Sequence, residues 1–191
     1  MLNGQKIIDM HAHTVAPPEL YAFKSTLLSG RGYHGKGAWS CSDERIVQFA
    51  QQNIDIMDKF GTDVQFLSPR PFQLMHSEKP ESIVHWFAEV NNDVIARHVK
   101  EFPDRFQGVA GLPQLSDQKD SSHAVPELER AVNELGFIGC LINPDPGEGT
   151  TYTPPMDDEY WFPLYEAMVK LDVAGLIHSA ACKDPRESYS A

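Results

Sequence analysis

The sequence predicts an α/β fold of parallel βα units, and three observations support this prediction. Short apolar runs alternate along the chain with longer segments whose apolar residues recur at helical spacing. The apolar runs lack the polar alternation of half-exposed strands, which is typical of strands covered on both faces. Polar side chains follow most of these runs, and ligands bind at the carboxyl ends of parallel strands in barrels and in open sheets alike.

The first βα unit is expected to start with a strand over residues 7–11, an apolar run that leads into polar residues. Its helix is expected over residues 44–60, where Ile, Val, Phe and Met recur at helical spacing before a glycine. The second unit combines a strand over residues 64–67 with a helix over residues 82–102. Pro103 ends this helix, because proline lacks the backbone N–H that a further turn requires.

The third strand is expected over residues 109–112 and its helix over residues 126–135, where a glycine again provides a stop signal. The fourth strand is expected over residues 137–142 and its helix over residues 158–171. A last apolar run over residues 174–178 gives the fifth strand. The sequence therefore predicts five strands joined by four complete crossovers.

Two long loops are expected at the carboxyl edge of the strands, because each follows a strand. Residues 14–42 contain four glycines, and residues 143–157 are rich in proline and glycine. A βα loop as long as residues 14–42 is typical of an active-site lid or an insertion, with a disordered loop as the alternative. Two long loops at one rim indicate a site there.

Length and charge narrow the class of protein further. The chain has 191 residues, enough for one domain with a substantial core. Asp and Glu number 27 against 16 Lys and Arg, which gives a formal net charge of −11. Such a chain is a poor match for nucleic acid or an anionic membrane, because phosphate binding needs clustered Lys and Arg. Small molecules and metal ions are the expected partners.

The cysteines and the apolar segments indicate a reduced, cytoplasmic setting. Cys41, Cys140 and Cys182 are odd in number and far apart, so neither a disulfide framework nor a cysteine-based zinc site is expected. No stretch reaches the roughly 18 apolar residues of a membrane span, and the N-terminus lacks the pattern of an export signal. We therefore expect a cytoplasmic protein without a membrane segment.

Histidines at two strand ends carry the most specific chemical pattern. His11 and His13 lie at the end of the first strand, and side chains at i and i+2 of an extended backbone point the same way. His178 ends the fifth strand. Three imidazoles suit zinc, iron, nickel or copper and leave coordination positions open, as catalytic sites require. The sequence predicts a divalent-metal site at these histidines, with zinc as the first candidate and a surface pair of histidines as the alternative.

The order of these motifs resembles the amidohydrolase superfamily. Ile-Ile-Asp-Met-His-Ala-His at residues 7–13 and Leu-Ile-His at residues 176–178 are similar to its first and fifth strands, which end in metal-ligating histidines. Gly-Cys-Leu-Ile-Asn-Pro-Asp-Pro at residues 139–146 and Tyr-Trp-Phe-Pro-Leu-Tyr-Glu at residues 160–166 resemble one branch of it. That branch holds aminocarboxymuconate-semialdehyde decarboxylase, γ-resorcylate decarboxylase and 4-oxalomesaconate hydratase. The resemblance covers residues 7–182.

This resemblance implies a (β/α)8 barrel of the TIM type, of which about five βα units are present here. A complete barrel of this kind needs about 250 residues. The superfamily also implies a catalytic histidine from the sixth strand and a carboxylate ligand from the eighth, and neither has a candidate before Ala191. We therefore expect residues 1–191 to form a single amidohydrolase-like domain that is incomplete at its C-terminus, and we assign no catalytic residue.

Two further residues are candidates for substrate binding. Arg70 follows the second strand and can clamp a substrate carboxylate through two parallel hydrogen bonds, with a surface salt bridge as the alternative. Asn143 follows the fourth strand, where it either hydrogen-bonds a substrate or caps a turn before Pro144. An acidic protein that binds an anionic substrate needs some such local cation.

The resemblance implies a metal-dependent lyase or hydrolase that acts on a small carboxylated substrate, such as a product of aromatic-ring cleavage. Decarboxylation and hydration are favoured over hydrolysis by the region around the fourth strand. One alternative is a catalytically silent domain or assembly partner, because an open five-stranded piece leaves two unpaired edges. Another is a metal phosphoesterase of the histidinol-phosphatase type, whose first strand also ends in His-x-His followed by Thr. We also expect the protein to form homo-oligomers.

Overall fold

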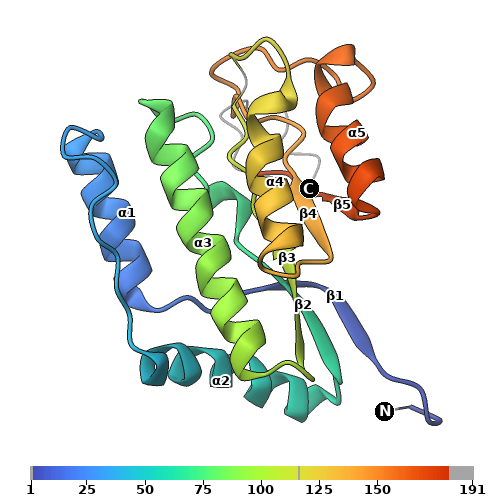
Figure 1. Ribbon diagram of the computed structural model, residues 1–191. Coiled ribbons are helices and arrows are strands. Elements are labelled where there is room, and N and C mark those ends of the chain that lie inside the picture. The colour runs from blue at the N-terminus through green and yellow to red at the C-terminus, as the bar shows by residue number, and fades with distance from the viewer. Residues whose placement is uncertain (1, 116, 181–191) are drawn as a thin grey trace.

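The computed structural model describes residues 2–115 and 117–180, which form one parallel sheet with helices packed against it (Figure 1). The strands follow one another across the sheet in chain order, and every neighbouring pair is parallel. They are β1 (Ile8–His13), β2 (Val64–Ser68), β3 (Phe106–Ala110), β4 (Gly139–Ile142) and β5 (Ala174–Ile177). This arrangement confirms the predicted α/β class and its parallel βα units.

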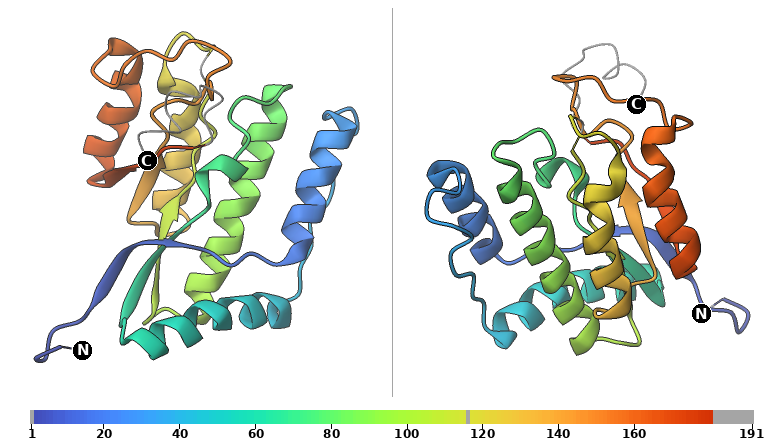
Figure 2. Two further views of the ribbon diagram at one scale, coloured as in Figure 1. Left: turned by 180° about the vertical axis from the view of Figure 1, so that it is seen from behind. Right: turned by 45° about the horizontal axis from the view of Figure 1, so that its top comes forward.

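Helices occupy every connection between successive strands. The α-helices are α1 (Pro18–Gly30) and α2 (Asp43–Phe60) in the first connection, then α3 (Glu81–Glu101), α4 (Val125–Asn133) and α5 (Phe162–Leu171). Among the described residues, three short 3-10 helices lie in the loops: η1 (Pro71–Gln73), η2 (Ser121–Ala124) and η3 (Glu159–Trp161). The left view of Figure 2 shows from behind that the helices lie on one side of the curved sheet.

Apolar residues from the sheet and from the inward faces of the helices form the core. The larger cluster lies between the sheet and helices α2 to α5, and its fully buried members include Met57, Leu67, Phe106, Leu128 and Trp161. A second cluster joins α1 to α3 and includes Leu20, Phe23, Leu27, Val84 and Phe87. Burial of such side chains from water is the main favourable contribution to folding, at about 1.5–3 kcal/mol for each.

Residues 14–42, expected as a long loop, contain helix α1. Leu20, Phe23 and Leu27 recur at spacings of three and four residues, so they share one helical face. All three are buried against α3, and Arg31 ends the helix in a left-handed conformation with a φ of 45°. The segment is therefore a packed helix followed by a glycine-rich connection.

Strand β3 begins three residues earlier than the apolar pattern predicts. Gln107 and Gly108 interrupt that pattern, although both belong to the strand. Gly108 has a packing reason, since a Cβ atom here would lie 2.3 Å from the Cδ1 atom of Phe137. The remaining elements differ from their predicted ranges only at their ends, where the chain leaves regular structure.

The sheet face opposite the helices is open in the part of the chain that the structure describes. Met10 of β1 is 67% exposed and Ile177 of β5 is 61% exposed. Both strands therefore differ from the expectation of strands covered on both faces. None of the helices in this part combines the length and the apolar character that a bilayer crossing requires.

Candidate metal centre

Three histidines from opposite edges of the sheet meet at the carboxyl ends of the strands. His11 and His13 belong to β1, and His178 directly follows β5. One ligand nitrogen from each ring lies within 4.8 Å of the other two. The ring centroids of His11 and His178 are 4.7 Å apart, and those of His13 and His178 are 5.3 Å apart. Because β1 and β5 are the first and last strands of the sheet, its curvature is what brings these rings together.

Strand β1 is irregular at its histidine pair. Asp9 pairs with Gln65 of β2, but Ala12 pairs with Leu67, so β1 carries one extra residue over this interval. A bulge of this kind redirects nearby side chains. Met10 and His11 are consequently both exposed, although successive side chains of a regular strand alternate between faces. Within the histidine pair itself exposure still alternates, because Ala12 is buried between the exposed His11 and the half-buried His13. The i, i+2 orientation that the sequence suggests is thus compatible with the bulge, and the two rings converge.

The hydrogen bonds of His13 determine which ring nitrogen is available. The Ser68 hydroxyl donates its proton to the Ala12 carbonyl at 3.1 Å, so it can only accept from the Nδ1 atom of His13, also at 3.1 Å. Nδ1 then carries the ring proton, and the lone pair is on Nε2. Metal-binding histidines are oriented by this kind of hydrogen bond from the other ring nitrogen.

His178 is fixed in a similar way by backbone groups. Its Nδ1 atom donates to the Ser179 carbonyl at 2.7 Å, which leaves the lone pair on Nε2. Its backbone N–H donates to the Ile142 carbonyl at 2.9 Å, which extends the pairing of β5 with β4 by one residue. The sheet thus positions the His178 backbone as well as its ring.

The electrostatics of the cluster favour a neutral imidazole at His13. Burial lowers the pKa of His13 below its ordinary value, and the nearby His178, His11 and Arg70 lower it further. A hydrogen bond to the backbone of Pro69 has the smallest effect and raises this pKa. Neutral imidazole is the form that binds a metal ion. Three converging nitrogen donors, two of them with the proton held on Nδ1, therefore suit a divalent transition metal.

Comparison with known proteins identifies the family. A protein-family model described as Amidohydrolase matches residues 8–188. The chain belongs to the amidohydrolase family. This confirms the resemblance seen in the histidine motifs. The five consecutive parallel strands with their four helical connections are those of a partial (β/α)8 barrel, as predicted.

Curated relatives of this amidohydrolase-family chain act on carboxylated substrates. The 2-keto-4-carboxy-3-hexenedioate hydratase of a Sphingobium species is 37% identical over 94% of this chain and 53% of its own length. A gamma-resorcylate decarboxylase of a Polaromonas species is 30% identical over 86% of this chain and 49% of its own length. The chain therefore spans about half the length of the curated relatives that it matches.

Solved structures show the same fold. The 4-oxalomesaconate hydratase of Rhodopseudomonas palustris matches with a TM-score of 0.80 and 32% identity, over 91% of this chain and 52% of that one. A dihydroxybenzoic acid decarboxylase of a Polaromonas species matches with a TM-score of 0.64 and 24% identity, over 97% of this chain and 52% of that one. That decarboxylase holds manganese and the inhibitor 2-nitroresorcinol, so its metal is not the zinc that we expected from the sequence.

Arg70 lies within electrostatic reach of the histidines of this amidohydrolase-family chain. It is exposed two residues after the end of β2, and its charge is one of the causes that lower the pKa of His13. No Asp or Glu among the described residues forms an ion pair with it. The salt-bridge alternative for Arg70 thus has no partner in that part of the chain.

Asn143 is only 2% exposed and its side chain is engaged at both ends. Its Nδ2 atom donates to the Nδ1 atom of His76 at 2.9 Å, and its Oδ1 atom accepts from the Asp145 backbone N–H at 3.0 Å. The second bond is the turn cap that the sequence offered as one of two roles. Contact between Asn143 and a substrate stays a prediction.

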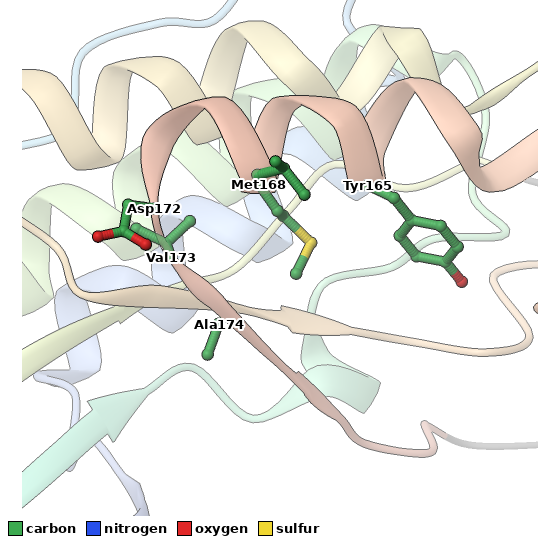
Figure 3. A pocket seen from close by; sticks show the side chains of 6 residues that line it. Tyr165, Met168, Asp172, Val173 and Ala174 are labelled. Atoms are coloured by element: carbon green, nitrogen blue, oxygen red, sulfur yellow. The ribbon is translucent and has the colours of Figure 1, made fainter.

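A separate hollow of about 640 Å³ lies beside helix α5 and the start of β5 (Figure 3). Tyr165, Met168, Asp172 and Ala174 are among its lining residues. Because Ala174 begins β5 and His178 follows its end, this hollow lies at the opposite end of the strand from the histidines. It is therefore distinct from the candidate metal centre.

Sequence reasoning missed the residues that support the histidines from behind. The sequence motifs point to none of the three supporting residues, Ser68, Asn53 and Gln65. Of these, Asn53 and Gln65 carry side-chain amides. Both amides interrupt apolar stretches, and both are buried, at 6% and 7% exposure. A polar residue at an inward position of a helix or strand is the pattern that could have identified them.

Proposed function

We propose that this chain is the metal-binding part of an amidohydrolase-family lyase that hydrates or decarboxylates a small carboxylated substrate. The observation that carries the proposal is the convergence of three imidazole nitrogens within 4.8 Å at the carboxyl edge of the sheet. Arg70 beside this cluster gives it a group for an anionic substrate. The relatives, a hydratase and decarboxylases of carboxylated compounds, support the substrate class.

His11, His13 and His178 would hold one divalent cation. Such a cation supplies Lewis acidity that polarises an oxygen-bearing group of the substrate. Manganese is the first metal to test, because the Polaromonas decarboxylase holds it, and zinc is the second. Three protein ligands leave open positions, as a catalytic site needs.

The remaining roles fall to side chains that bind and orient. Arg70 would bind the substrate carboxylate in a bidentate manner, which fixes its orientation relative to the histidines. Ser68 and the Ser179 carbonyl keep the proton of their histidine partners on Nδ1, so that the lone pair of Nε2 would be available to a cation.

Metal uptake is the first test. The purified chain is loaded with Mn²⁺ or Zn²⁺, desalted and analysed for metal, and about one ion per chain is expected. The double variant His11→Ala/His13→Ala should lose it, whereas His34→Ala, which alters an exposed loop histidine, should retain it. Equal metal in the double variant and the unsubstituted chain would defeat the assignment.

The reaction is tested in an active form of the protein with a carboxylated diene and a dihydroxybenzoate. Water addition without release of CO2 indicates a hydratase, and release of CO2 indicates a decarboxylase. Phosphate release from a phosphomonoester would instead favour the phosphoesterase alternative. Metal binding without turnover of any of these substrates would favour the catalytically silent domain.

Arg70→Ala provides the matching test of substrate binding. A hydrogen bond to a charged group contributes about 1.5–3 kcal/mol, so KM should rise about 10- to 100-fold while the metal content stays unchanged. An unchanged KM would show that Arg70 does not bind the substrate.

A further inference from the structure

The bulge in β1 leaves the backbone around His11 without its regular partners in the sheet. The register shifts between Asp9 and Ala12, which is the interval that contains His11. A strand segment that has lost ladder hydrogen bonds needs other partners to adopt a single conformation. Three polar side chains from β1, β2 and α2 supply them: Asp9, Gln65 and Asn53.

These side chains form a continuous chain of hydrogen bonds behind the histidines. Asp9 accepts from the His11 backbone N–H through Oδ1, at 3.1 Å, and from Gln65 Nε2 through Oδ2, at 3.0 Å. Gln65 Oε1 in turn accepts from Asn53 Nδ2 at 3.2 Å. The amide of Asn53 is thereby linked to the backbone of His11 through two intervening side chains.

Asn53 also forms hydrogen bonds with the backbone at the other end of the histidine pair. Its Nδ2 atom donates to the His13 carbonyl at 3.2 Å, and its Oδ1 atom accepts from the Val15 backbone N–H at 3.3 Å. The network therefore fixes the backbone on both sides of the bulge, at His11 and at residues 13–15. No other described side chain of α2 makes a hydrogen bond to this strand end.

The location of the two amides makes a general packing role a poor explanation. Neighbouring positions on the inward face of α2 hold Ala50, Ile54 and Met57, all buried and apolar. A buried amide is expensive unless its hydrogen bonds are satisfied, and an apolar residue at either position would avoid that expense. Both amides instead direct their hydrogen bonds to the strand that carries the histidines, or to each other.

We propose that Asn53 and Gln65 are positioning residues that hold β1 in its bulged form, so that His11 and His13 present their rings to the same cation. This inference rests on the proposed metal-binding function. It assigns to the pair a role in metal affinity and ligand geometry, in addition to any contribution to stability.

The test measures Mn²⁺ affinity by titration and the visible absorption spectrum of the Co²⁺-loaded chain, which reports ligand geometry. The variants are Asn53→Ala, the near-isosteric Asn53→Asp, and Gln65→Met, so that a folded protein is available even where one substitution prevents folding. Loss of outer partners of metal ligands weakens binding by about 10- to 100-fold. We therefore expect the Kd for Mn²⁺ to rise at least about 10-fold in each folded variant, with an altered Co²⁺ spectrum.

The matched control is Asn91→Ala. Asn91 is also a buried asparagine, but its Nδ2 atom donates to the Phe87 carbonyl within α3 at 2.7 Å, away from the histidines. This variant should lose stability and keep both the Mn²⁺ affinity and the Co²⁺ spectrum of the unsubstituted chain. The contrast separates positioning of the metal ligands from a loss of stability alone.

Folded Asn53 and Gln65 variants with unchanged Mn²⁺ affinity and Co²⁺ spectrum would overturn the proposal, and so would an equal loss of affinity in Asn91→Ala. An unsubstituted chain that binds no Mn²⁺ and no Co²⁺ would overturn it together with the metal centre. A chain that binds Mn²⁺ but turns over no carboxylated substrate would refute only the proposed lyase, because the affinity comparison still decides the positioning role.

Discussion

Single hydrogen bonds determine which ring nitrogen of His13 and of His178 is available to a ligand. Ser68 is 2% exposed and lies at the end of β2, where it bridges the Ala12 carbonyl and the His13 ring. Its hydroxyl has one proton, and the carbonyl accepts it, so the ring nitrogen facing Ser68 must be the one that carries a proton. One residue therefore sets both the tautomer and the orientation of a proposed ligand.

The substitution Ser68→Ala should weaken Mn²⁺ binding by about 10-fold, because His13 loses the partner that holds its Nδ1 proton. Ser121→Ala is the matched control, since Ser121 is equally buried but accepts from the Leu164 backbone N–H at 3.2 Å, on α5. Titration of both variants with Mn²⁺ makes the comparison. A similar affinity in the two would show that Ser68 does not orient the ligand.

Two buried histidines outside the cluster give the folded state a pH dependence. His76 donates from Nε2 to the Leu112 carbonyl, and its Nδ1 accepts from Asn143, so its ring is held neutral. Burial lowers its pKa to about 4. Burial, with a contribution from the Arg97 charge, also lowers the pKa of His98 to about 4. Both rings are therefore neutral in the folded protein at pH 7.

In the unfolded chain these histidines titrate near pH 6.5, as free side chains do. Between about pH 6.5 and pH 4 the unfolded state binds protons that the folded state does not. The free energy of unfolding should thus be highest above pH 6.5 and fall toward pH 4, by up to about 3 kcal/mol for each ring. Urea unfolding between pH 7 and pH 4.5 measures this slope.

His76→Gln should make that slope shallower, because one of the two buried titrating rings is removed. His34→Gln, at an exposed loop position, should leave the slope unchanged. A free energy of unfolding that stays constant from pH 7 to pH 5 in the unsubstituted chain would contradict the expectation.

Among the helices and strands, local sequence patterns predicted most of the fold. The helical spacing in α2 and the prolines that flank α3 identified those helices to within a residue at each end. Helix α1 was missed because its apolar stripe is short and lies in a segment with many glycines.

In the candidate site, too, some features can be predicted from local sequence and others depend on contacts between distant segments. The strand-end positions of His11, His13 and His178 could be read from the sequence, because they follow local apolar runs. The bulge in β1 could not, since it depends on the register with β2, whose partner residues lie more than 50 positions away. The roles of Asn53 and Gln65 follow from that register, which is why the sequence pattern alone did not indicate them.

Close approach of β4 and β5 gives a prediction at this scale. A Cβ atom at Gly139 would lie 2.5 Å from the Ala174 carbonyl oxygen of β5, its partner in the sheet. Gly139→Ala should therefore force β5 away from β4, lower the free energy of unfolding by about 1–3 kcal/mol and displace His178. Chemical denaturation and Mn²⁺ titration measure both effects.

Gly30→Ala is the control for this substitution, because Gly30 lies in helix α1 with no atom within 4 Å of the added Cβ. It should leave Mn²⁺ binding unchanged and stabilise the chain slightly, by about 0.5–1 kcal/mol. A Gly139→Ala chain as stable as the Gly30→Ala chain would show that β4 and β5 accommodate the added methyl group without a loss in the free energy of unfolding.

At the scale of the whole molecule, curvature of the sheet creates the candidate site and an exposed apolar face together. The first and last strands approach closely enough for their histidines to meet, yet the face of the sheet opposite the helices is open in residues 2–115 and 117–180. A hollow of about 190 Å³ on this face is lined mainly by apolar residues of all five strands, such as Met10 and Leu176, together with His11. Contiguous apolar surface of this kind marks an interaction surface.

The 191-residue chain in solution is therefore expected to self-associate through this face in spite of its net charge of −11. Met10→Glu and Ile177→Lys each place a charge on the open face and should shift the sedimentation profile toward the monomer.

Tyr33→Lys is the control for these two substitutions. Tyr33 is 91% exposed in the glycine-rich connection after α1, so this substitution should not alter the sedimentation profile. Sedimentation velocity over a range of concentrations compares the three variants with the unsubstituted chain. A monomer at every concentration would show that the open face does not drive association, and an equal shift in Tyr33→Lys would attribute the effect to charge alone.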